Sequence, residues 1–378
     1  MQERQLKTLF KSYKETSLFG RYIYTDSILN LLKSNSVKSH VSTIGKSVNQ
    51  EDIYSITIGS GSKKILMWSQ MHGNESTTTK AIFDLLNTLM ASEQVSKFIL
   101  EACTLCIIPI LNPDGAKAYT RLNANNIDLN RDAQELSQPE SKALKQVFNE
   151  FKPDYCFNLH DQRTIYSAGN TNNPATVSFL APAQDADCTI TDTRKVAMEI
   201  VSVMNSNLQQ QIPDQVGVYD DAFNINCVGD TFQSLDTPTI LFEAGHFQKD
   251  YDREITREYI FQSLFIAIHY IAKQLHITGE HYKDYLKIPE NQKMFYDIII
   301  RNTLNRDIGI LYKEVLKNGS IDFVPTIKKI SNLNACFAHK EIDARGFEVL
   351  TGDGNVLLEE SENDFVFINN ENFSLKLK

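Results

Sequence analysis

The segment Ile65-Leu-Met-Trp-Ser-Gln-Met-His72-Gly-Asn-Glu75 decides how the rest of the chain is interpreted. It begins as an apolar run typical of a buried β-strand and ends in a histidine and a glutamate three residues apart. A short turn through Gly73 and Asn74 allows the imidazole and the carboxylate to converge on one cation beyond the strand's carboxyl end. Zn²⁺ takes histidine nitrogen and carboxylate oxygen, and a catalytic zinc keeps one coordination position open. The segment therefore predicts part of a catalytic zinc site.

A third protein ligand is expected elsewhere in the chain. The segment Tyr155-Cys-Phe-Asn-Leu-His160 repeats the pattern of an apolar strand that ends in a histidine. His160 is thus the first candidate, and His246 is the second. A histidine at a strand end is, taken alone, more often structural than a ligand, so the assignment depends on the whole set. We expect one zinc ion held by His72, Glu75 and His160.

Size and composition indicate a globular enzyme domain with a smaller domain appended. The chain has 378 residues, of which 42% are hydrophobic and 22% charged. The net charge is −9 and basic residues do not cluster, so neither nucleic acid nor an anionic membrane is expected as a partner. The polar N-terminal sequence lacks the apolar core of a signal peptide, and no apolar run is long enough to span a bilayer. These features predict a cytoplasmic protein; they do not predict its oligomeric state.

The six cysteines favour a reducing compartment over a disulfide framework. Cys103 and Cys106 form a C-x-x-C pair within the β-like run Glu-Ala-Cys-Thr-Leu-Cys-Ile-Ile-Pro-Ile. Alternate residues of a strand face opposite ways, so the two thiols should diverge. We interpret both as core cysteines.

Hydrophobic periodicity predicts an α/β fold with a mixed central sheet flanked by helices. Residues 1–34 have helical apolar spacing, and a hairpin at the sheet edge follows over 41–45 and 53–58. Beyond residue 60 the predicted strands and helices alternate, as expected for a layered sheet. The predicted strands are 65–71, 105–110, 155–159, 177–181 and 239–243, and the predicted helices are 76–90, 139–151, 191–211 and 253–275.

Polar side chains follow four of these strands. His72, Asn112, His160 and Glu243 each fall at a carboxyl end. Ligands of α/β sheets bind beyond the carboxyl ends of the strands. The four residues are therefore expected to lie along one rim.

The character of the sequence changes near residue 288. Short β-like runs over 296–300, 308–311, 347–350 and 364–368 are separated by turn residues. We expect two domains: a catalytic domain over 1–285 that carries the zinc site and whose residues 1–34 form a helical lead-in, and a small β-rich domain over 286–378.

Several polar residues suit the hydrolysis of an amide bond. Glu243 is a lone acid at the end of an apolar strand, where desolvation would raise its pKa toward that of a useful general base and acid. Arg121 lies in the loop after Asn112-Pro-Asp-Gly115 and can stabilise an oxyanion. Asn130 and Arg131 suit a substrate carboxylate, and Asp128 can orient a ligand histidine.

With these residues in view, the chain resembles the zinc carboxypeptidase family, whose best-known members are the pancreatic carboxypeptidases. The resemblance covers about residues 40–275. It rests on an ordered set of motifs: His72-x-x-Glu75, Asn112-Pro-Asp-Gly115, Arg121, Asp128-Leu-Asn130-Arg131, His160 and Glu243. It implies that His72, Glu75 and His160 bind zinc and that Glu243 is the general base and acid. It also implies that Arg121 polarises the scissile carbonyl, while Asn130 and Arg131 hold the C-terminal carboxylate.

Two further residues are assigned to substrate binding through this resemblance. Family members often carry a tyrosine some twenty residues before the catalytic glutamate, on a loop that closes over substrate, and Tyr219 is the nearest match. Gly229-Asp230-Thr231 is a candidate lining of the specificity pocket. Asp230 there would favour a basic side chain, and a solvated loop aspartate is the alternative.

The motif His-Gly-Asn-Glu and the β-like C-terminal segment are also similar to the succinylglutamate desuccinylase and aspartoacylase relatives, which cleave acyl groups from amino acids. Asn-Pro-Asp-Gly and the spacing from Arg121 to Asn130 look more like the peptidases. Three functions stay open: a metallocarboxypeptidase acting on peptides, an N-acyl amino acid amidohydrolase, and a non-catalytic peptide-binding protein. The intact Glu243 speaks against the third.

Overall fold

A computed structural model describes residues 3–34, 37–91 and 93–377. The chain divides into two compact units: residues 1–162 with 175–291, and residues 163–174 with 292–378. The sequence placed the boundary at residue 286 and left 163–174 in the first domain. The structure assigns that segment to the second unit, since β6 (Tyr166–Ala168) pairs with β10 (Asn291–Lys293) and Ile165 O accepts a hydrogen bond from Phe295 N at 3.0 Å.

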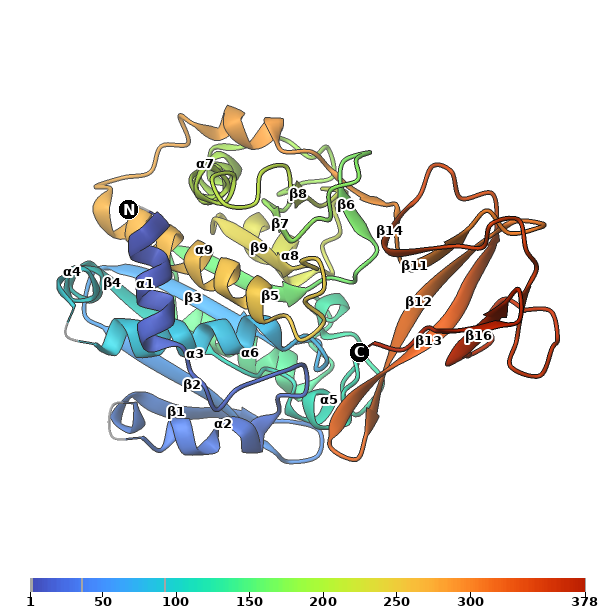
Figure 1. The fold of residues 1–378 in the computed structure, drawn as a ribbon. Helices are drawn as coiled ribbons and strands as arrows, with labels where there is room; N and C mark the ends of the chain where they lie inside the picture. The colour runs from blue at the N-terminus through green and yellow to red at the C-terminus, as the bar shows by residue number, and fades with distance from the viewer. Residues whose placement is uncertain (1–2, 35–36, 92, 378) are drawn as a thin grey trace. The chain divides into compact units, whose positions relative to one another are not determined.

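An eight-stranded mixed sheet organises the first unit (Figure 1), in the order β1-β2-β4-β3-β5-β9-β7-β8. The predicted edge hairpin is confirmed, because β1 and β2 are antiparallel. The four central strands β4, β3, β5 and β9 run parallel, whereas β2 and β7 are antiparallel to their central neighbours. The strand bounds are β1 Val41–Lys46, β2 Asp52–Gly59, β3 Lys63–Ser69, β4 Cys103–Ile108, β5 Tyr155–Asp161, β7 Val177–Leu180, β8 Val216–Val218 and β9 Thr239–Ala244.

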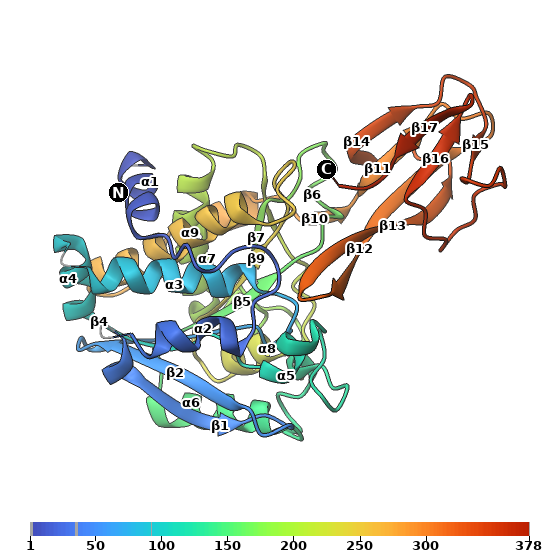
Figure 2. The ribbon, with the colours of Figure 1, turned by 60° about the horizontal axis from the view of Figure 1, so that its bottom comes forward.

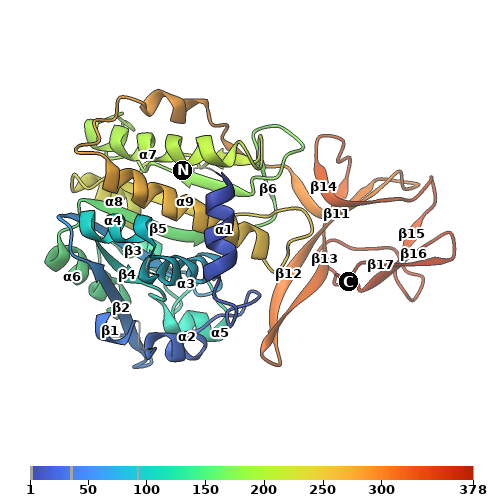
Figure 3. The same cartoon turned by 60° about the vertical axis from the view of Figure 1, so that its left-hand side comes forward.

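Helices cover both faces of this sheet, which is the expected architecture. On one face α3 and α9 pack together, with α1 across them and α7 beside α9 (Figures 2 and 3). Residues of α6 and α8 pack against the other face. The bounds are α1 Glu3–Tyr13, α2 Thr25–Leu32, α3 Thr77–Met90, α4 Gln94–Ala102, α5 Pro113–Ala118, α6 Pro139–Phe151, α7 Asp192–Leu208, α8 Val228–Ser234 and α9 Glu254–Lys273. Among the described residues, short 3₁₀ helices span Lys38–His40, Leu129–Arg131 and Tyr282–Lys287.

Residues 65–69 of β3, the apolar run that precedes His72, are all buried. Trp68 has no exposed surface and packs edge-on against Phe232 of α8. Cys103 and Cys106 lie in separate apolar clusters on opposite faces of the sheet, so the predicted divergence of their thiols is confirmed. All six cysteines are free thiols.

The second unit is built from two small sheets around an isoleucine-rich core. One sheet has the order β13-β12-β11-β14, and the other has the order β15-β16-β17. The bounds are β11 Phe295–Arg301, β12 Asp307–Lys317, β13 Ser320–Ser331, β14 Phe337–Asp343, β15 Val349–Leu350, β16 Phe365–Ile368 and β17 Glu371–Ser374. This unit is β-rich, as the sequence predicted. In neither unit does a described helix have the length and apolarity needed to cross a bilayer.

Candidate active site

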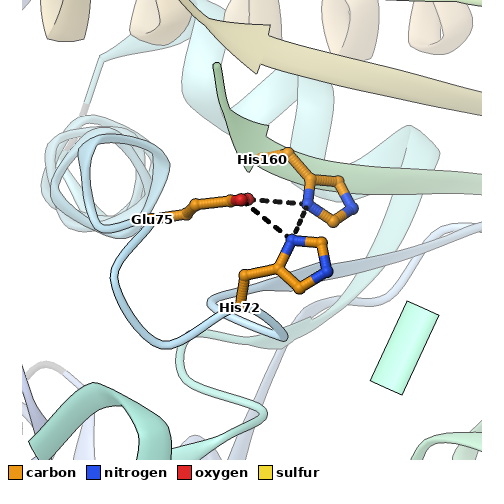
Figure 4. A group of neighbouring side chains, drawn as sticks. All are labelled: His72, Glu75 and His160. Carbon is orange, nitrogen blue, oxygen red and sulfur yellow. Dashed lines mark hydrogen bonds and ion pairs between the residues drawn. The ribbon is translucent and has the colours of Figure 1, made fainter. Parts of the chain in front are cut away.

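Two imidazoles and one carboxylate meet beyond the ends of β3 and β5 (Figure 4). His72 Nδ1 lies 2.9 Å from Glu75 Oε1, and His160 Nδ1 lies 2.8 Å from Glu75 Oε2. The two Nδ1 atoms are 3.0 Å apart. All three side chains are buried. The structure thus brings together the three residues that the sequence selected.

The loop between β3 and α3 carries two members of this cluster and is held by its own polar groups. Gln70 has a left-handed backbone (φ 45°), and its amide Nε2 donates to Ile23 O and Gly73 O. Gly73 packs against the backbone of the Asn-Pro-Asp-Gly segment. A Cβ added at Gly73 would come within 1.9 Å of the carbonyl carbon of Gly115, so only glycine allows this approach.

Parallel strand pairing brings His160 and Glu243 together. His160 on β5 stands opposite Glu243 on β9 in the strand register. The Glu243 side chain is half-buried, but its Oε2 is buried and lacks a hydrogen-bond partner among the described residues. An unpartnered carboxylate oxygen in such a place is costly, and burial is the first cause that raises the pKa of Glu243 well above its ordinary value. The negative charges of Glu75 and Asp161 raise it further.

The donor set of the cluster fits a metal ion. The candidate ligand atoms of His72, Glu75 and His160 all lie within 4.8 Å of one another. Two imidazole nitrogens and an anionic carboxylate that face one another can direct their lone pairs at a single cation. Zinc binds such nitrogen and oxygen ligands at about 2.0–2.2 Å. The contacts of 2.8 to 3.0 Å place the ligands close to the separation that such an ion requires.

Asp128 and Arg121 surround the cluster on its exposed side. His72 Nε2 is 3.0 Å from Asp128 Oδ1, so the predicted contact of Asp128 with a ligand histidine is confirmed. Arg121 donates from Nε and Nη2 to Asp128 Oδ2 at 3.1 and 3.0 Å, and from Nη1 to Glu75 Oε1 at 3.3 Å. The Arg121 side chain is 46% exposed, so its guanidinium can reach both the cluster and a ligand in solvent.

Charges and burial perturb the pKa of each member of the cluster. Burial alone would raise the pKa of Glu75, but the two imidazoles hold it well below its usual range. Burial lowers the pKa of both histidines; in His72 the carboxylates of Glu75 and Asp128 outweigh it and raise the pKa, whereas in His160 burial prevails. An anionic Glu75 and a neutral His160 are the forms that bind a metal ion.

Asn130 and Arg131 lie in a 3₁₀ turn directly after Asp128. The Asp128 carboxylate accepts the backbone N–H of Asn130 at 2.9 Å. The side chain of Asn130 accepts the N–H of Val228 at 3.0 Å, and Arg131 Nη1 donates to Cys227 Sγ at 3.2 Å. Both residues are thereby tied to the start of α8. Arg131 is exposed, and Asn130 is half-buried.

The structure places Tyr219 directly after β8, where its N–H donates to Phe179 O at 3.0 Å. Its role on a closing loop stays a prediction. Asp230 lies in the first turn of α8 and is only 8% exposed, so the alternative of a solvated loop aspartate is wrong. Its Oδ1 accepts the N–H of Asn224 at 3.1 Å, and burial raises its pKa to about 6. Its part in substrate specificity stays a prediction.

The remaining polar residues at the rim have local structural contacts. Asn112 caps α5 by accepting the N–H of Gly115 at 2.8 Å. Asp161 accepts both the N–H and the hydroxyl of Thr77 at the start of α3, and it donates its own N–H to Glu75 at 3.2 Å. His246 is buried and stacks on Tyr251 with ring centroids 4.6 Å apart. It is not a member of the three-residue cluster.

One buried residue near the site escaped sequence analysis. Arg253 precedes α9, and its guanidinium donates to the carbonyl group of the last residue of β9 and to that of the residue that follows β5. The surrounding sequence, Asp250-Tyr-Asp-Arg-Glu254, reads as an exposed polar turn. It carries no signal that the arginine side chain folds inward.

Known proteins similar to this chain include members of the zinc carboxypeptidase family and proteins named carboxypeptidases. The family model for zinc carboxypeptidases matches residues 24–235, which is more than half of the chain and ends before Glu243. Carboxypeptidase 2 of Trichophyton rubrum is 30% identical over 115 residues, which are 30% of this chain and 21% of that protein. The chain thus spans about a fifth of the length of such curated relatives.

Solved structures share the fold at low sequence identity. A metallo-carboxypeptidase from Pseudomonas aeruginosa, in complex with (2-guanidinoethylmercapto)succinic acid, aligns with a TM-score of 0.53 and 16% identity, over 67% of this chain and 70% of that one. Bovine thrombin-activatable fibrinolysis inhibitor, in complex with tick carboxypeptidase inhibitor, aligns with a TM-score of 0.52 and 15% identity, over 66% of this chain and 96% of that one.

Proposed function

The chain belongs to the zinc carboxypeptidase family, and from this premise we propose that it hydrolyses the peptide bond next to a free C-terminal carboxylate. The observation that carries the proposal is the convergence of His72, Glu75 and His160 on one point, with the unpartnered carboxylate oxygen of Glu243 on the neighbouring strand.

Zinc is the cofactor of the family, and His72, Glu75 and His160 would hold it through two imidazole nitrogens and a carboxylate. When bound in an open site, Zn²⁺ lowers the pKa of a water molecule and polarises a carbonyl oxygen. Asp128 would orient the His72 ring through its contact with Nε2. Its carboxylate also keeps the adjacent Arg121 in place.

Glu243 would accept the proton of the attacking water and pass it to the leaving amine. Its raised pKa supports this role, because a general base and acid works best when its pKa lies near the working pH. The positive charge of a bound cation would lower that pKa.

Arg121, Asn130 and Arg131 would bind the substrate. The half-exposed guanidinium of Arg121 next to Glu75 suits the oxyanion that develops on the scissile carbonyl. Arg131 can meet a carboxylate with two parallel N–H donors, and Asn130 offers an amide beside it. Tyr219 and Asp230 are the further residues proposed to contact the substrate.

An N-acyl amino acid amidohydrolase is the second candidate, because the His-Gly-Asn-Glu motif is combined with a β-rich second unit. Both reactions would use the same metal cluster. They differ in what lies on the acyl side of the bond, which is a peptide in one case and a small acyl group in the other.

A matched substrate panel tests the proposal. Purified protein is loaded with zinc, its metal content is measured, and it is then given the same peptides with a free or an amidated C-terminus, together with acylated amino acids. We expect release of the C-terminal residue from free-carboxylate peptides only. Activity on acylated amino acids alone would establish the second candidate.

Two variants separate binding from chemistry. Arg131→Ala should raise KM for free-carboxylate peptides by roughly 10- to 100-fold, the cost of a lost charge-assisted contact of about 1.5–3 kcal/mol. Glu243→Gln should lower kcat by roughly 10²- to 10⁴-fold, the contribution of general acid–base catalysis, and should retain zinc. Unchanged hydrolysis in Glu243→Gln would remove Glu243 from the mechanism.

A further inference from the structure

Arg253 is a buried cation at the carboxyl end of the central sheet. Its side chain is 1% exposed. Nη1 donates to Ala244 O at 2.6 Å and to Gly245 O, and Nη2 donates to Gln162 O at 2.8 Å. These carbonyl groups follow Glu243 on β9 and His160 on β5. One guanidinium therefore spans the two chain segments that carry the metal cluster's third ligand and the proposed proton carrier.

The bonds of Arg253 extend the ladder between β5 and β9. The strand register pairs His160 with Glu243 and Asp161 with Ala244, and Gln162 N donates to Ala244 O at 2.9 Å. Beyond this point the two backbones separate into loops. The planar guanidinium bridges them, since its donors point in fixed directions. A side chain from another element thus adds to the backbone hydrogen bonds that hold the two strand ends together.

The turn before α9 holds Arg253 in an unusual backbone conformation. Arg253 has φ 60°, which is sparsely populated for a residue with a side chain, and its N–H donates to Asp250 O at 3.1 Å. The Asp250 carboxylate accepts the N–H groups of Glu254, Ile255 and Thr256. Buried Lys80 donates to Asp252 O at 3.0 Å. The turn is therefore secured on several sides, and this directs the guanidinium inward.

We propose that Arg253 is a positioning residue that sets the distance and orientation of Glu243 relative to His160. It does so through backbone carbonyl groups and touches neither substrate nor metal. Its effect on catalysis rests on the function proposed above, whereas its effect on the metal cluster does not.

The chain provides a matched control in Arg257, four residues further on. This arginine is also fully buried, and it donates to Asp84 from Nε and Nη2 at 2.7 Å and to Leu18 O at 2.6 Å. It connects α9 to α3 and to the N-terminal segment and makes no bond to β5 or β9. Replacing it should reduce stability without moving the strand ends.

The test compares Arg253→Lys with Arg257→Lys. Lysine keeps the charge but cannot reproduce the two-nitrogen fork. We expect both variants to unfold at lower temperature. Only Arg253→Lys should lower kcat, by about 100-fold if Glu243 moves by on the order of 1 Å. Its KM should stay within about threefold of the wild-type value, because no substrate contact is lost. Its zinc affinity, measured by competition with a chelator, should fall roughly 10-fold because His160 loses its support.

Equal kcat and equal zinc affinity in the two variants would overturn the proposal, since the two arginines would then matter only for folding. If Arg253→Lys does not fold, Asp250→Ala loosens the same turn while the arginine stays in place, and it should lower kcat by about 10-fold relative to Arg257→Lys. A kcat equal to that of the control would again contradict the assignment. If the wild-type protein hydrolyses nothing, the proposed function fails, and the zinc affinities still decide the role of Arg253.

Discussion

At the scale of single residues, His72 is oriented through both of its ring nitrogens. Nδ1 faces the cluster, and Nε2 faces Asp128 at 3.0 Å. A carboxylate in this position fixes the tautomer of a ligand imidazole and increases its basicity. The same carboxylate binds the guanidinium of Arg121, so one acid orients two groups of the site.

Asp128→Asn should therefore weaken zinc binding by roughly 10- to 100-fold. The reason is that an amide neither fixes the His72 ring as a carboxylate does nor pairs with Arg121. Chelator competition measures the affinity. Asp132→Asn is the control, because Asp132 accepts the N–H groups of Ser137 and Gln138 and contacts no member of the cluster. Equal affinities in the two variants would contradict the role of Asp128.

Asp230 predicts a dependence of stability on pH. Burial is the main cause that raises its pKa from the ordinary 3.8 to about 6. Between these values the folded protein keeps a proton that the unfolded chain has released. The stabilising contribution is complete below pH 3.8 and is lost as the pH rises through about 6.

Denaturant unfolding of the wild type and of Asp230→Asn measures this contribution. The unfolding free energy of the wild type minus that of the variant should fall by about 3 kcal/mol between pH 3.5 and pH 7, since each pKa unit corresponds to about 1.4 kcal/mol. A difference that stays constant over this range would mean that the carboxyl group is not perturbed.

At this scale the sequence predicted the metal cluster and Asp128 because each belongs to a short motif with fixed spacing. It could not predict Arg253, whose function depends on a left-handed backbone and on carbonyl groups about 10 and 90 positions away in the chain. The sequence identified Asp230 as a candidate pocket residue but did not predict that its side chain is buried, because its burial depends on the packing of α8.

At the scale of elements, the β3–α3 loop packs at Gly73 against Gly115 of α5. Gly73 contacts the backbone of Gly115, and a Cβ at Gly115 would come within 2.4 Å of the Asn112 side chain. Close backbone approach fixes the β3–α3 loop relative to α5, and with it the direction of His72 and Glu75.

Gly73→Ala tests this packing. The added methyl group meets backbone atoms that cannot rotate away, so we expect a loss of roughly 1–3 kcal/mol in unfolding free energy and weaker zinc binding. Gly45→Ala is the control, because an added Cβ would meet only the Ala143 methyl group, at 3.0 Å. Gly45 lies on the edge strand β1, which β2 and β4 separate from β3. Zinc affinity unchanged in Gly73→Ala would show that the loop adapts without moving its ligands.

Helices with a strong hydrophobic periodicity were predicted with nearly correct bounds, whereas several short helices and strands were missed. The helix predicted over 139–151 is α6, Pro139–Phe151, with proline in its first turn. Helix α8 was missed because Val228–Ser234 is too short to show a period. The hairpin of β12 and β13 was predicted only in part, although Asn318-Gly319 has the positive φ angles of a tight turn. An Asn-Gly dipeptide between two β-like runs is a strong hairpin signal.

At the scale of the whole molecule, the second unit is discontinuous in sequence. Residues 163–174 leave the first unit between β5 and β7 and bond with the C-terminal strands. Thr164 O lies 2.9 Å from His339 Nε2, and Ile165 O accepts Phe295 N. The sequence predicted a simple C-terminal domain because no local pattern reveals the distant partner of a twelve-residue loop.

Truncation tests this organisation. Deleting residues 292–378 should remove His339 Nε2 and Phe295 N, the hydrogen-bond partners of Thr164 O and Ile165 O. The truncated protein should therefore unfold at a temperature about 5 °C or more below that of the full chain and should aggregate. A second variant also replaces 163–174 with a short Gly-Ser linker. Gln162 Nε2 is 2.5 Å from Ala175 O, so the ends are close enough to join. We expect the second variant to recover cooperative thermal unfolding. If both variants unfold at the same temperature, residues 163–174 do not belong to the second unit.

Because residues 163–174 pair with strands that follow residue 292, a protease nick near that residue would not release the distal fragment. The fragment would stay bound to residues 163–174 through the hydrogen bonds of that segment. The two pieces would co-elute from a sizing column in native buffer and separate only in urea.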